Sequence, residues 1–484
     1  MRFRHLIHVV SIILIALSVP LAATAILALL FRDGSFLAFL GATVVAAGAG
    51  IIGFRTTSLT RDLSIREGYA VVSLSWLAIG IVGAIPYVLS GVVASPVAAL
   101  FESVSGFTTT GATVFGDIES LPRGVLFWRA LTQWIGGMGI IVLGVAILPF
   151  LGVGGMQLFQ AEVPGPTPER LAPRITQTAK LLWLVYAGLT VVQVLLYLLA
   201  GMGIFDAITH AFTTMSTGGF STRNASIAAY DSAWIHWITI VFMYLAGINF
   251  TLHWHAVSGK PKRYLDDAEW RTYTFLMIAS TVLIAAVLYA RAGYPQLGLE
   301  RTVRDALFQA ASIATTTGFV SADWELWPYA TQMLLFLLMF VGGMAGSTAG
   351  GMKTIRFLAF HRHGVTWMRR SIHPKAVVLT RIGRRALRDD DMLDILAFAL
   401  LFLVLFVAGA LALTLLGHDL ITSMGASASA LGNVGPGLGD VGAVDNYGWM
   451  GPLTHLVLIG QMLAGRLEIF TVLLLFHPDL WRRK

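Results

Sequence analysis

Four short segments of the chain combine hydroxyl side chains with a glycine in a way that suits cation binding. They end in Thr109-Thr110-Gly111, Ser216-Thr217-Gly218, Thr316-Thr317-Gly318 and Asn433-Val434-Gly435. Glycine tolerates positive φ and so lets the backbone turn a carbonyl oxygen inward, and the hydroxyls add further oxygen ligands. Because the turns themselves contain no carboxylate, they favour a weakly hydrated monovalent cation over Ca²⁺ or Mg²⁺.

These four turns recur at intervals of about 100 residues, which is typical of a repeat architecture. Each follows an apolar stretch of about a dozen residues, too short to cross a bilayer, and lies between two longer apolar segments. Non-helical backbone is tolerated at membrane depth only where protein buries it or where it lines a water-filled cavity. We therefore predict four units of span, re-entrant pore helix, filter turn and span around one pseudo-fourfold pore.

The elements that must position the turns are long apolar runs. The chain has 484 residues, of which 56% are hydrophobic and 12% charged, against about 25% charged in a soluble domain. This composition excludes a soluble enzyme, a disordered protein and a collagen-like fibre, and it predicts an all-α polytopic membrane protein. Ten transmembrane helices are expected, at about 6–31, 35–54, 68–90, 123–150, 178–202, 232–257, 271–293, 329–356, 391–416 and 450–476.

The first two spans precede the repeats, so the expected organisation has five parts. These are two N-terminal transmembrane helices (1–60), a first pore repeat (61–160), a second (161–260), a third with a gating loop and a basic cytoplasmic linker (261–390), and a fourth (391–484).

Basic residues indicate the orientation of the chain. With ten spans and the N-terminus inside, 25 of the 33 Lys and Arg fall on inside segments and six on outside ones. This bias fits the positive-inside rule, so both termini are predicted to be cytoplasmic and the net charge of +7 requires no nucleic-acid partner. The basic segment at about 358–390 is either a solvated topology determinant or a docking surface for a cytosolic partner or anionic lipid.

The span after the third turn is interrupted by small residues. It contains Gly342, Gly343, Gly346, Ser347, Thr348, Gly350 and Gly351, with Lys353 just beyond. Each glycine destabilises a helix by about 1 kcal/mol, so we expect an unwound segment in mid-membrane. It is either a mobile loop that gates the pore or a site of close helix packing. Nucleotide binding is excluded because Met352 interrupts the Gly-Lys pair of a P-loop.

Arg466 lies within the last span. An ionisable residue at this depth is a functional hypothesis by default. It is expected to repel cations below the filter, to hydrogen-bond loop carbonyls, or to do both. His253 and His255 lack a third ligand for a metal, so a structural role is expected for them.

Several stretches resemble the TrkH/TrkG family, within the superfamily of potassium transporters (Trk/Ktr/HKT). They include FESVSGFTTTGAT (101–113), MSTGGFST (215–222), GGMAGSTAGGMKTIRF (342–357), GNVGPGLG (432–439) and AGRLEI (464–469). The resemblance covers essentially the whole chain. It implies a potassium-selective subunit of a bacterial Trk-type uptake system in the inner membrane, a homodimer, and control by a cytosolic TrkA-like ring that binds nucleotides.

The resemblance also assigns residues. It implies potassium binding at Thr110, Gly111, Thr217, Gly218, Thr317, Gly318, Val434 and Gly435, supported by Thr109, Ser216, Thr316 and Asn433. The gate would be Gly342–Gly351 together with Lys353 and Arg466. Gly111 favours potassium, since related plant transporters with serine there transport sodium. The fourth turn departs from the TTTG pattern.

The leading hypothesis is gated, passive potassium permeation, driven by about 2.3 kcal/mol per 100 mV of membrane potential. The alternative is a proton- or sodium-coupled potassium symporter, which would usually require a relay of carboxylates or histidines across the bilayer. Glu102, Asp206 and Asp305 instead lie near the outer pore-helix regions. An enzyme or a scaffold protein would not need four re-entrant glycine turns.

Overall fold

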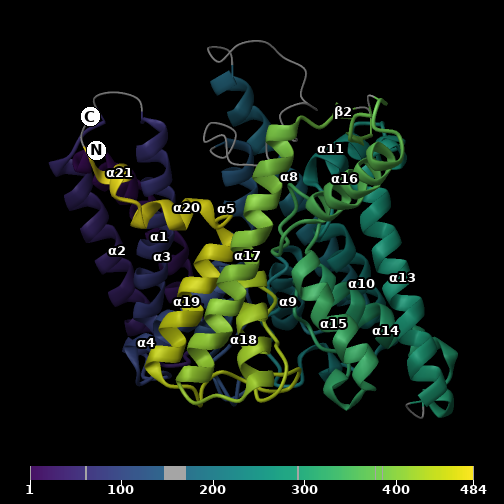
Figure 1. Cartoon of the computed structure of the whole chain (residues 1–484). Helices are drawn as coiled ribbons and strands as arrows, with labels where there is room; N and C mark the ends of the chain where they lie inside the picture. Colours follow the sequence, from purple (N-terminus) through teal and green to yellow (C-terminus); the bar gives the residue numbers. More distant parts are fainter. Residues whose placement is uncertain are drawn as a thin grey trace.

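The computed structural model describes residues 2–59, 63–146, 171–291, 294–376, 378–383 and 385–482. Its first two helices, α1 (Phe3–Phe31) and α2 (Phe36–Thr56), pack against each other and lie at one side of the molecule (Figure 1). They are joined by a tight turn in which Arg32 has a φ of 52°. Both are apolar along their length, as expected for helices in lipid.

The rest of the transmembrane region repeats an order of helix, short helix, helix. The four units are α3 (Ile65–Leu89), α4 (Pro96–Phe107) and α5 (Arg123–Ala146); α8 (Leu171–Leu199), α9 (Ile204–Met215) and α10 (Ala233–Ala246); α13 (Ala268–Arg291), α14 (Leu299–Ala314) and α15 (Tyr329–Val341); and α17 (Asp389–Leu415), α18 (Leu420–Gly432) and α19 (Pro452–Arg466). The short helices α4, α9, α14 and α18 have 12 to 16 residues, too few to span. The predicted re-entrant pore helices are therefore present in all four units.

Polar residues begin two of these pore helices. The side chain of Ser95 accepts a hydrogen bond from the backbone N–H of Ala98 at the start of α4. The carboxylate of Asp419 accepts bonds from the backbone N–H groups of Ile421 and Thr422, the second and third residues of α18. Such caps satisfy donors that the helix itself leaves free.

Contacts between units close them into a ring. The third helix of each unit packs against the pore helix of the next, in the pairs α5 with α9, α10 with α14, and α15 with α18. The last helix, α19, packs against α4 of the first unit. This cyclic order provides the pseudo-fourfold arrangement expected from the sequence.

Two of the predicted spans are sharply bent rather than continuous. The segment expected at 232–257 consists of α10 and α11 (Phe250–Val257), which meet at 103°. The segment expected at 450–476 divides into α19 and the helical turns that follow it, α20 (Phe470–Leu473) and a 3₁₀ turn (Leu474–Phe476), at 119°. Asn249 begins α11 by accepting a bond from Thr251 N, and Glu468 and Ile469 break the last span with φ values of 60° and 46°.

Within the described residues, six helices are long and apolar enough to cross a membrane, and the two bent pairs bring the number to eight. The other two expected spans correspond to α5, whose predicted end at 147–150 lies outside the described residues, and to α15, which is shorter than predicted.

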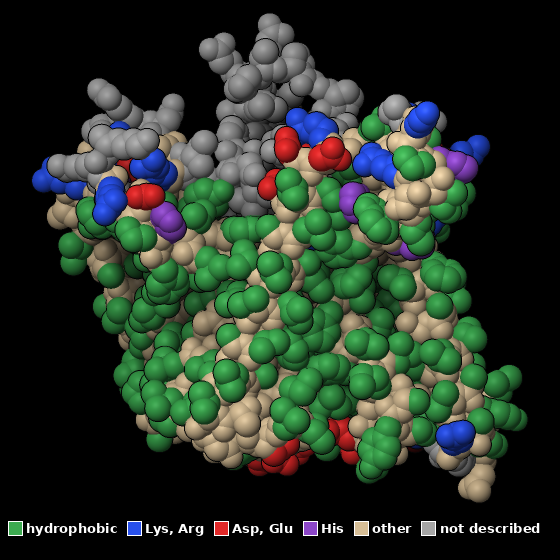
Figure 2. Space-filling view, viewed as in Figure 1, with side chains coloured by type: hydrophobic (Ala, Val, Ile, Leu, Met, Phe, Trp, Pro, Cys, Tyr) green, Lys and Arg blue, Asp and Glu red, His purple; other side chains and the backbone are tan. Residues whose placement is uncertain are grey.

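The basic segment after the third unit is more ordered than a plain loop. It forms the helix α16 (Thr354–Ile372) and a small antiparallel hairpin of β1 (Arg381–Ile382) and β2 (Arg385–Ala386). Figure 2 shows lysine and arginine side chains gathered at the end of the molecule that carries this segment, above a broad hydrophobic band. The N- and C-termini lie toward the same end (Figure 1).

Candidate ion-conducting site

The four turns share one backbone conformation. Directly after each pore helix, or one residue beyond, a non-glycine residue adopts a left-handed conformation with φ between 52° and 57°: Thr109, Thr217, Thr316 and Asn433. Two residues later a glycine has positive φ: Gly111, Gly219, Gly318 and Gly435. The residue between them donates its backbone N–H to the carbonyl five positions back in the pore helix, from Thr110 to Ser105, Gly218 to Thr213, Thr317 to Ser312 and Val434 to Ser429.

This conformation corrects the second turn by one residue. The sequence interpretation aligned Gly218 with Gly111, because each follows a threonine. In the structure Gly219 occupies the position of Gly111, while Gly218 occupies that of Thr110. Gly219 is therefore a turn residue that the sequence interpretation missed, and Thr217 is equivalent to Thr109 rather than to Thr110.

The turns lie edge to edge in a closed ring. A Cβ atom on each positive-φ glycine would lie within 3.0 Å of a carbonyl oxygen in the next turn: Gly111 on Gly218, Gly219 on Thr317, Gly318 on Val434, and Gly435 on Thr110. Real Cβ atoms essentially never approach that closely. Glycine is thus required at these positions both for its φ and for the close approach of the neighbouring backbone.

A cavity of about 100 Å³ opens on one face of this ring. The four positive-φ glycines line it, together with residues that follow the turns, among them Thr113, Arg129, Asp445 and Tyr447. Gly218 is absent from the lining, which agrees with the corrected alignment. The glycines therefore lie between the pore helices and a space large enough for water or an ion.

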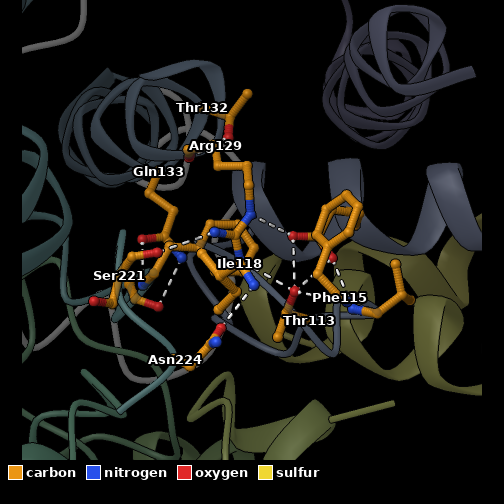
Figure 3. Close-up of polar contacts among 12 residues, drawn as sticks. Thr113, Phe115, Ile118, Arg129, Thr132, Gln133, Ser221 and Asn224 are labelled. Carbon is orange, nitrogen blue, oxygen red and sulfur yellow. Dashed lines mark hydrogen bonds and ion pairs between the residues drawn. The ribbon is translucent and has the colours of Figure 1, made fainter. Parts of the chain in front are cut away.

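A buried ion pair lies behind the first two turns. Arg129 on α5 donates to the carboxylate of Glu102 on α4 at 2.7 Å, and both side chains are almost fully buried. The same guanidinium donates to Thr113 Oγ1 and to the carbonyl of Ser221, each at 3.1 Å (Figure 3). Arg129 thus connects the segment after the first turn with the segment after the second.

Arg129 lies in the span expected at 123–150, where the sequence interpretation assigned it no role, and Glu102 was expected near an outer pore-helix region. A charge within a span was the signal that could have singled out Arg129. Its partner lies on another helix 27 residues away, which helical periodicity does not reveal.

The glycine-rich segment forms a loop across the opposite side of the turns. The helix α15 stops at Val341, and Gly342 follows with a φ of 72°. Thr348 donates its hydroxyl to the carbonyls of Met215 and Ala246 at 3.0 and 3.1 Å. The helix therefore does not continue through the glycines, and the unwound segment expected from the sequence is present.

Two further bonds tie the loop to the turns. Gly350 donates its N–H to Thr316 Oγ1 at 2.6 Å, and Gly351 donates to the carbonyl of Gly432 at 3.0 Å. The loop therefore reaches the ends of the second, third and fourth pore helices. The expected gate residues Gly342, Gly343, Gly346, Ser347, Thr348, Gly350 and Gly351 all lie in it.

Two charged side chains donate hydrogen bonds to carbonyls of this loop. Arg466 is buried and donates to the carbonyl of Thr348 at 2.7 Å and toward that of Gly136 at 3.5 Å. Lys353, at the end of the loop, donates to the carbonyl of Ala349. The sequence interpretation that Arg466 reaches loop carbonyls agrees with these contacts.

A carboxylate connects the first half of the loop to the start of α16. Glu269 on α13 accepts hydrogen bonds from the N–H of Ala345 at 2.8 Å and from that of Ile355 at 3.0 Å. Glu468 pairs with Arg356 at 2.6 Å, and the same guanidinium donates to the carbonyl of Met352 at 2.7 Å. Sequence reasoning missed Glu269, whose only signal was a charge at the start of a span.

The remaining ionisable candidates are paired locally. Asp206 accepts from Thr222, Tyr230 and Arg223, and Asp305 lies 3.7 Å from Arg301. The ring of His253 bonds Leu245 O and Tyr264 OH. In the part of the chain that the structure describes, no group of three His, Cys, Asp or Glu could hold a metal ion.

The chain is similar over its length to known cation transport proteins. The family model described as "TrkH: Cation transport protein" matches residues 36–483. The chain is 41% identical to the Trk system potassium uptake proteins TrkH of Halomonas elongata and Escherichia coli, with full coverage of both chains in each case. It is 32% identical to TrkG of Escherichia coli over 99% of each chain.

A solved structure matches over the full length. The crystal structure of the potassium transporter TrkH from Vibrio parahaemolyticus superimposes with a TM-score of 0.91 at 38% identity, and covers 100% of both chains.

Proposed function

The chain belongs to the TrkH family of cation transport proteins and is a potassium transporter, not an enzyme, and on this premise we propose that its four turns are the potassium-selectivity filter. The proposal rests on one observation: the turns form a closed ring whose glycines line a cavity. Backbone carbonyls in such a ring can replace the hydration shell of potassium. Potassium is here the substrate rather than a resident cofactor.

The filter residues follow the corrected alignment. They are Thr110 and Gly111, Gly218 and Gly219, Thr317 and Gly318, and Val434 and Gly435, with Thr109, Ser216, Thr217, Thr316 and Asn433 in support. Each pore helix directs its C-terminal end at the turn that follows it, so the negative end of its dipole favours a cation there. This electrostatic attraction needs no carboxylate and is the same in all four units.

We further propose that Gly342–Gly351 is the gate, with Lys353 and Arg466 as the side chains that hold it. Support comes from the bonds that place the loop against the ends of three pore helices. In this position the loop would obstruct an ion that leaves the filter on the side away from the cavity. Opening then requires these few hydrogen bonds to be replaced by bonds to water, so the free-energy difference between the closed and open states would be modest.

Replacing Arg466 by alanine is expected to raise potassium flux about tenfold. A hydrogen bond from a charged donor is worth about 1.5–3 kcal/mol, and its loss releases the loop at Thr348 while it also removes a positive charge. Single-channel or vesicle flux measures the change. Arg466→Gln separates the two effects, because it keeps a donor and removes the charge. Unchanged flux in Arg466→Ala would restrict the residue to packing.

Transport is proposed to be passive. Support comes from Glu102, Asp206 and Asp305, each of which is paired with an arginine near its own pore helix. In liposomes with an imposed membrane potential, potassium uptake is expected to drive no stoichiometric proton or sodium movement. Acidification coupled to potassium entry, or a sodium requirement, would instead establish the symporter alternative.

The protein is a multi-pass membrane protein of a bacterial Trk system. We propose that it lies in the inner membrane as a homodimer with both termini in the cytoplasm, which the basic end of the molecule supports. We propose the five parts 1–60, 61–160, 161–260, 261–390 and 391–484 as the organisation of the chain, and the order of the helices supports this division. A cytosolic TrkA-like, nucleotide-binding ring would dock on the basic end near α16.

A further inference from the structure

The four turns differ at the residue between the left-handed position and the glycine. In the first and third turns this residue is a threonine whose hydroxyl bonds the hydroxyl of a threonine two residues back, Thr110 with Thr108 and Thr317 with Thr315, each at 2.7 Å. In the fourth it is the buried Val434. In the second it is Gly218, which has no side chain to hold the turn.

Gln133 occupies the space that Gly218 leaves. This residue lies on α5, in the first unit, and its side chain is fully buried. Its Nε2 donates to the carbonyl oxygen of Gly218 at 2.7 Å, and its Oε1 accepts from the N–H of Phe220 at 3.0 Å (Figure 3). A Cβ on Gly218 would lie within 3.0 Å of three atoms of the Gln133 amide.

These two bonds hold the backbone on either side of Gly219. Gly218 and Gly219 are consecutive glycines, and glycine loses more conformational freedom on ordering than any other residue. The carbonyl of Gly218 is also the atom that a Cβ on Gly111 would meet. A side chain that fixes both Gly218 and Phe220 therefore fixes the second turn against the first.

We infer that Gln133 is a positioning residue for potassium selectivity. Its amide, on a neighbouring helix, takes the place of the pair of threonine hydroxyls that holds the first turn and the third turn. The inference rests on the proposed filter function of the turns. A carbonyl oxygen has two lone pairs, so the bond from Gln133 leaves the Gly218 carbonyl able to face an ion. The amide thereby sets the orientation of that carbonyl without being a ligand.

Gln133→Met tests this role with little change in volume. Methionine keeps the packing and removes both hydrogen bonds, so the ratio of potassium to sodium permeability is expected to fall by roughly tenfold, while the protein still folds and conducts. The matched control is Gln193→Met, which alters another fully buried glutamine, on α8, whose amide bonds Tyr197 OH rather than a turn. The control is expected to keep the wild-type ratio.

A rescue experiment removes the ambiguity of a folding defect. Gly218 does not have positive φ, so its backbone accepts a side chain once Gln133 is shortened. In Gln133→Ala combined with Gly218→Thr, the new hydroxyl lies two residues after Ser216, as Thr110 follows Thr108. We expect this double variant to be about tenfold more potassium-selective than Gln133→Ala alone, and Gly218→Thr alone to be impaired by collision with Gln133.

Two results would overturn the inference: wild-type selectivity in Gln133→Met, or no gain in selectivity on adding Gly218→Thr to Gln133→Ala. Gly219→Ser serves as the reference for the filter itself. If it loses selectivity while Gln133→Met does not, the role of Gln133 is wrong and the filter stands. If neither variant changes selectivity, the proposed filter fails as well.

Discussion

Gly219→Ser is expected to lower the ratio of potassium to sodium permeability by about a hundredfold. An L-residue in the left-handed conformation costs about 1–2 kcal/mol, and a Cβ on Gly219 would also meet the carbonyl of Thr317. The turn must shift and move that carbonyl out of the ring, and a change of 1.4 kcal/mol corresponds to a factor of ten. Gly111→Ser is expected to weaken selectivity for the same reason. Bi-ionic potentials in liposomes measure the ratio.

Gly201 provides a matched control. It also has positive φ, at 91°, but a Cβ there meets nothing within 4 Å. Gly201→Ser therefore carries the conformational strain without the collision, and it is expected to keep wild-type selectivity. Equal ratios in Gly219→Ser and Gly201→Ser would contradict the assignment of Gly219 to the filter.

Deleting Gly346–Gly351 is expected to raise potassium flux in the absence of any partner by about a hundredfold. The deletion removes the bonds of Thr348, Gly350 and Gly351 to the pore-helix ends, and the remaining segment is too short to lie across the exit. A gate whose closed state is favoured by a few kcal/mol would open on such a scale. Vesicle uptake of a potassium tracer measures it.

Thr348→Ala is the milder companion to this deletion. It removes only the hydroxyl of Thr348, which lies within hydrogen-bond distance of the carbonyls of Met215 and Ala246. A hydroxyl has one proton, so it donates to one of these carbonyls at a time. Its expected effect is a severalfold rise in flux, since a neutral hydrogen bond contributes about 1 kcal/mol. Folded protein with basal flux unchanged in both variants would exclude a gating role for the loop.

The repeat of hydroxyl-rich glycine turns could be predicted from the sequence because each turn carries its own local signal between two apolar runs. The second turn shows where that signal ends. Gly218 and Gly219 are adjacent, and residue types alone do not say which of them has positive φ. The backbone geometry decides it, because Gly219 has a φ of 76° and Gly218 is not among the residues with positive φ.

The bend between α10 and α11 depends on contacts between segments that lie far apart in the chain. The segment after α10 turns where Gly247 accepts a bond from Met344 N and Phe250 donates to Gly346 O. Both partners belong to the glycine-rich loop, about 100 residues later. Apolar composition continues through the bend, so hydropathy alone predicts one straight helix.

The central proposal, that the four turns form one potassium-binding ring, is tested most directly by anomalous X-ray scattering from crystals grown in rubidium. We expect an anomalous peak inside the ring, bounded by the carbonyls of Thr110, Gly218, Thr317 and Val434 and next to the cavity that Gly111, Gly219, Gly318 and Gly435 line. Bound rubidium elsewhere in the protein, with the ring empty, would contradict it.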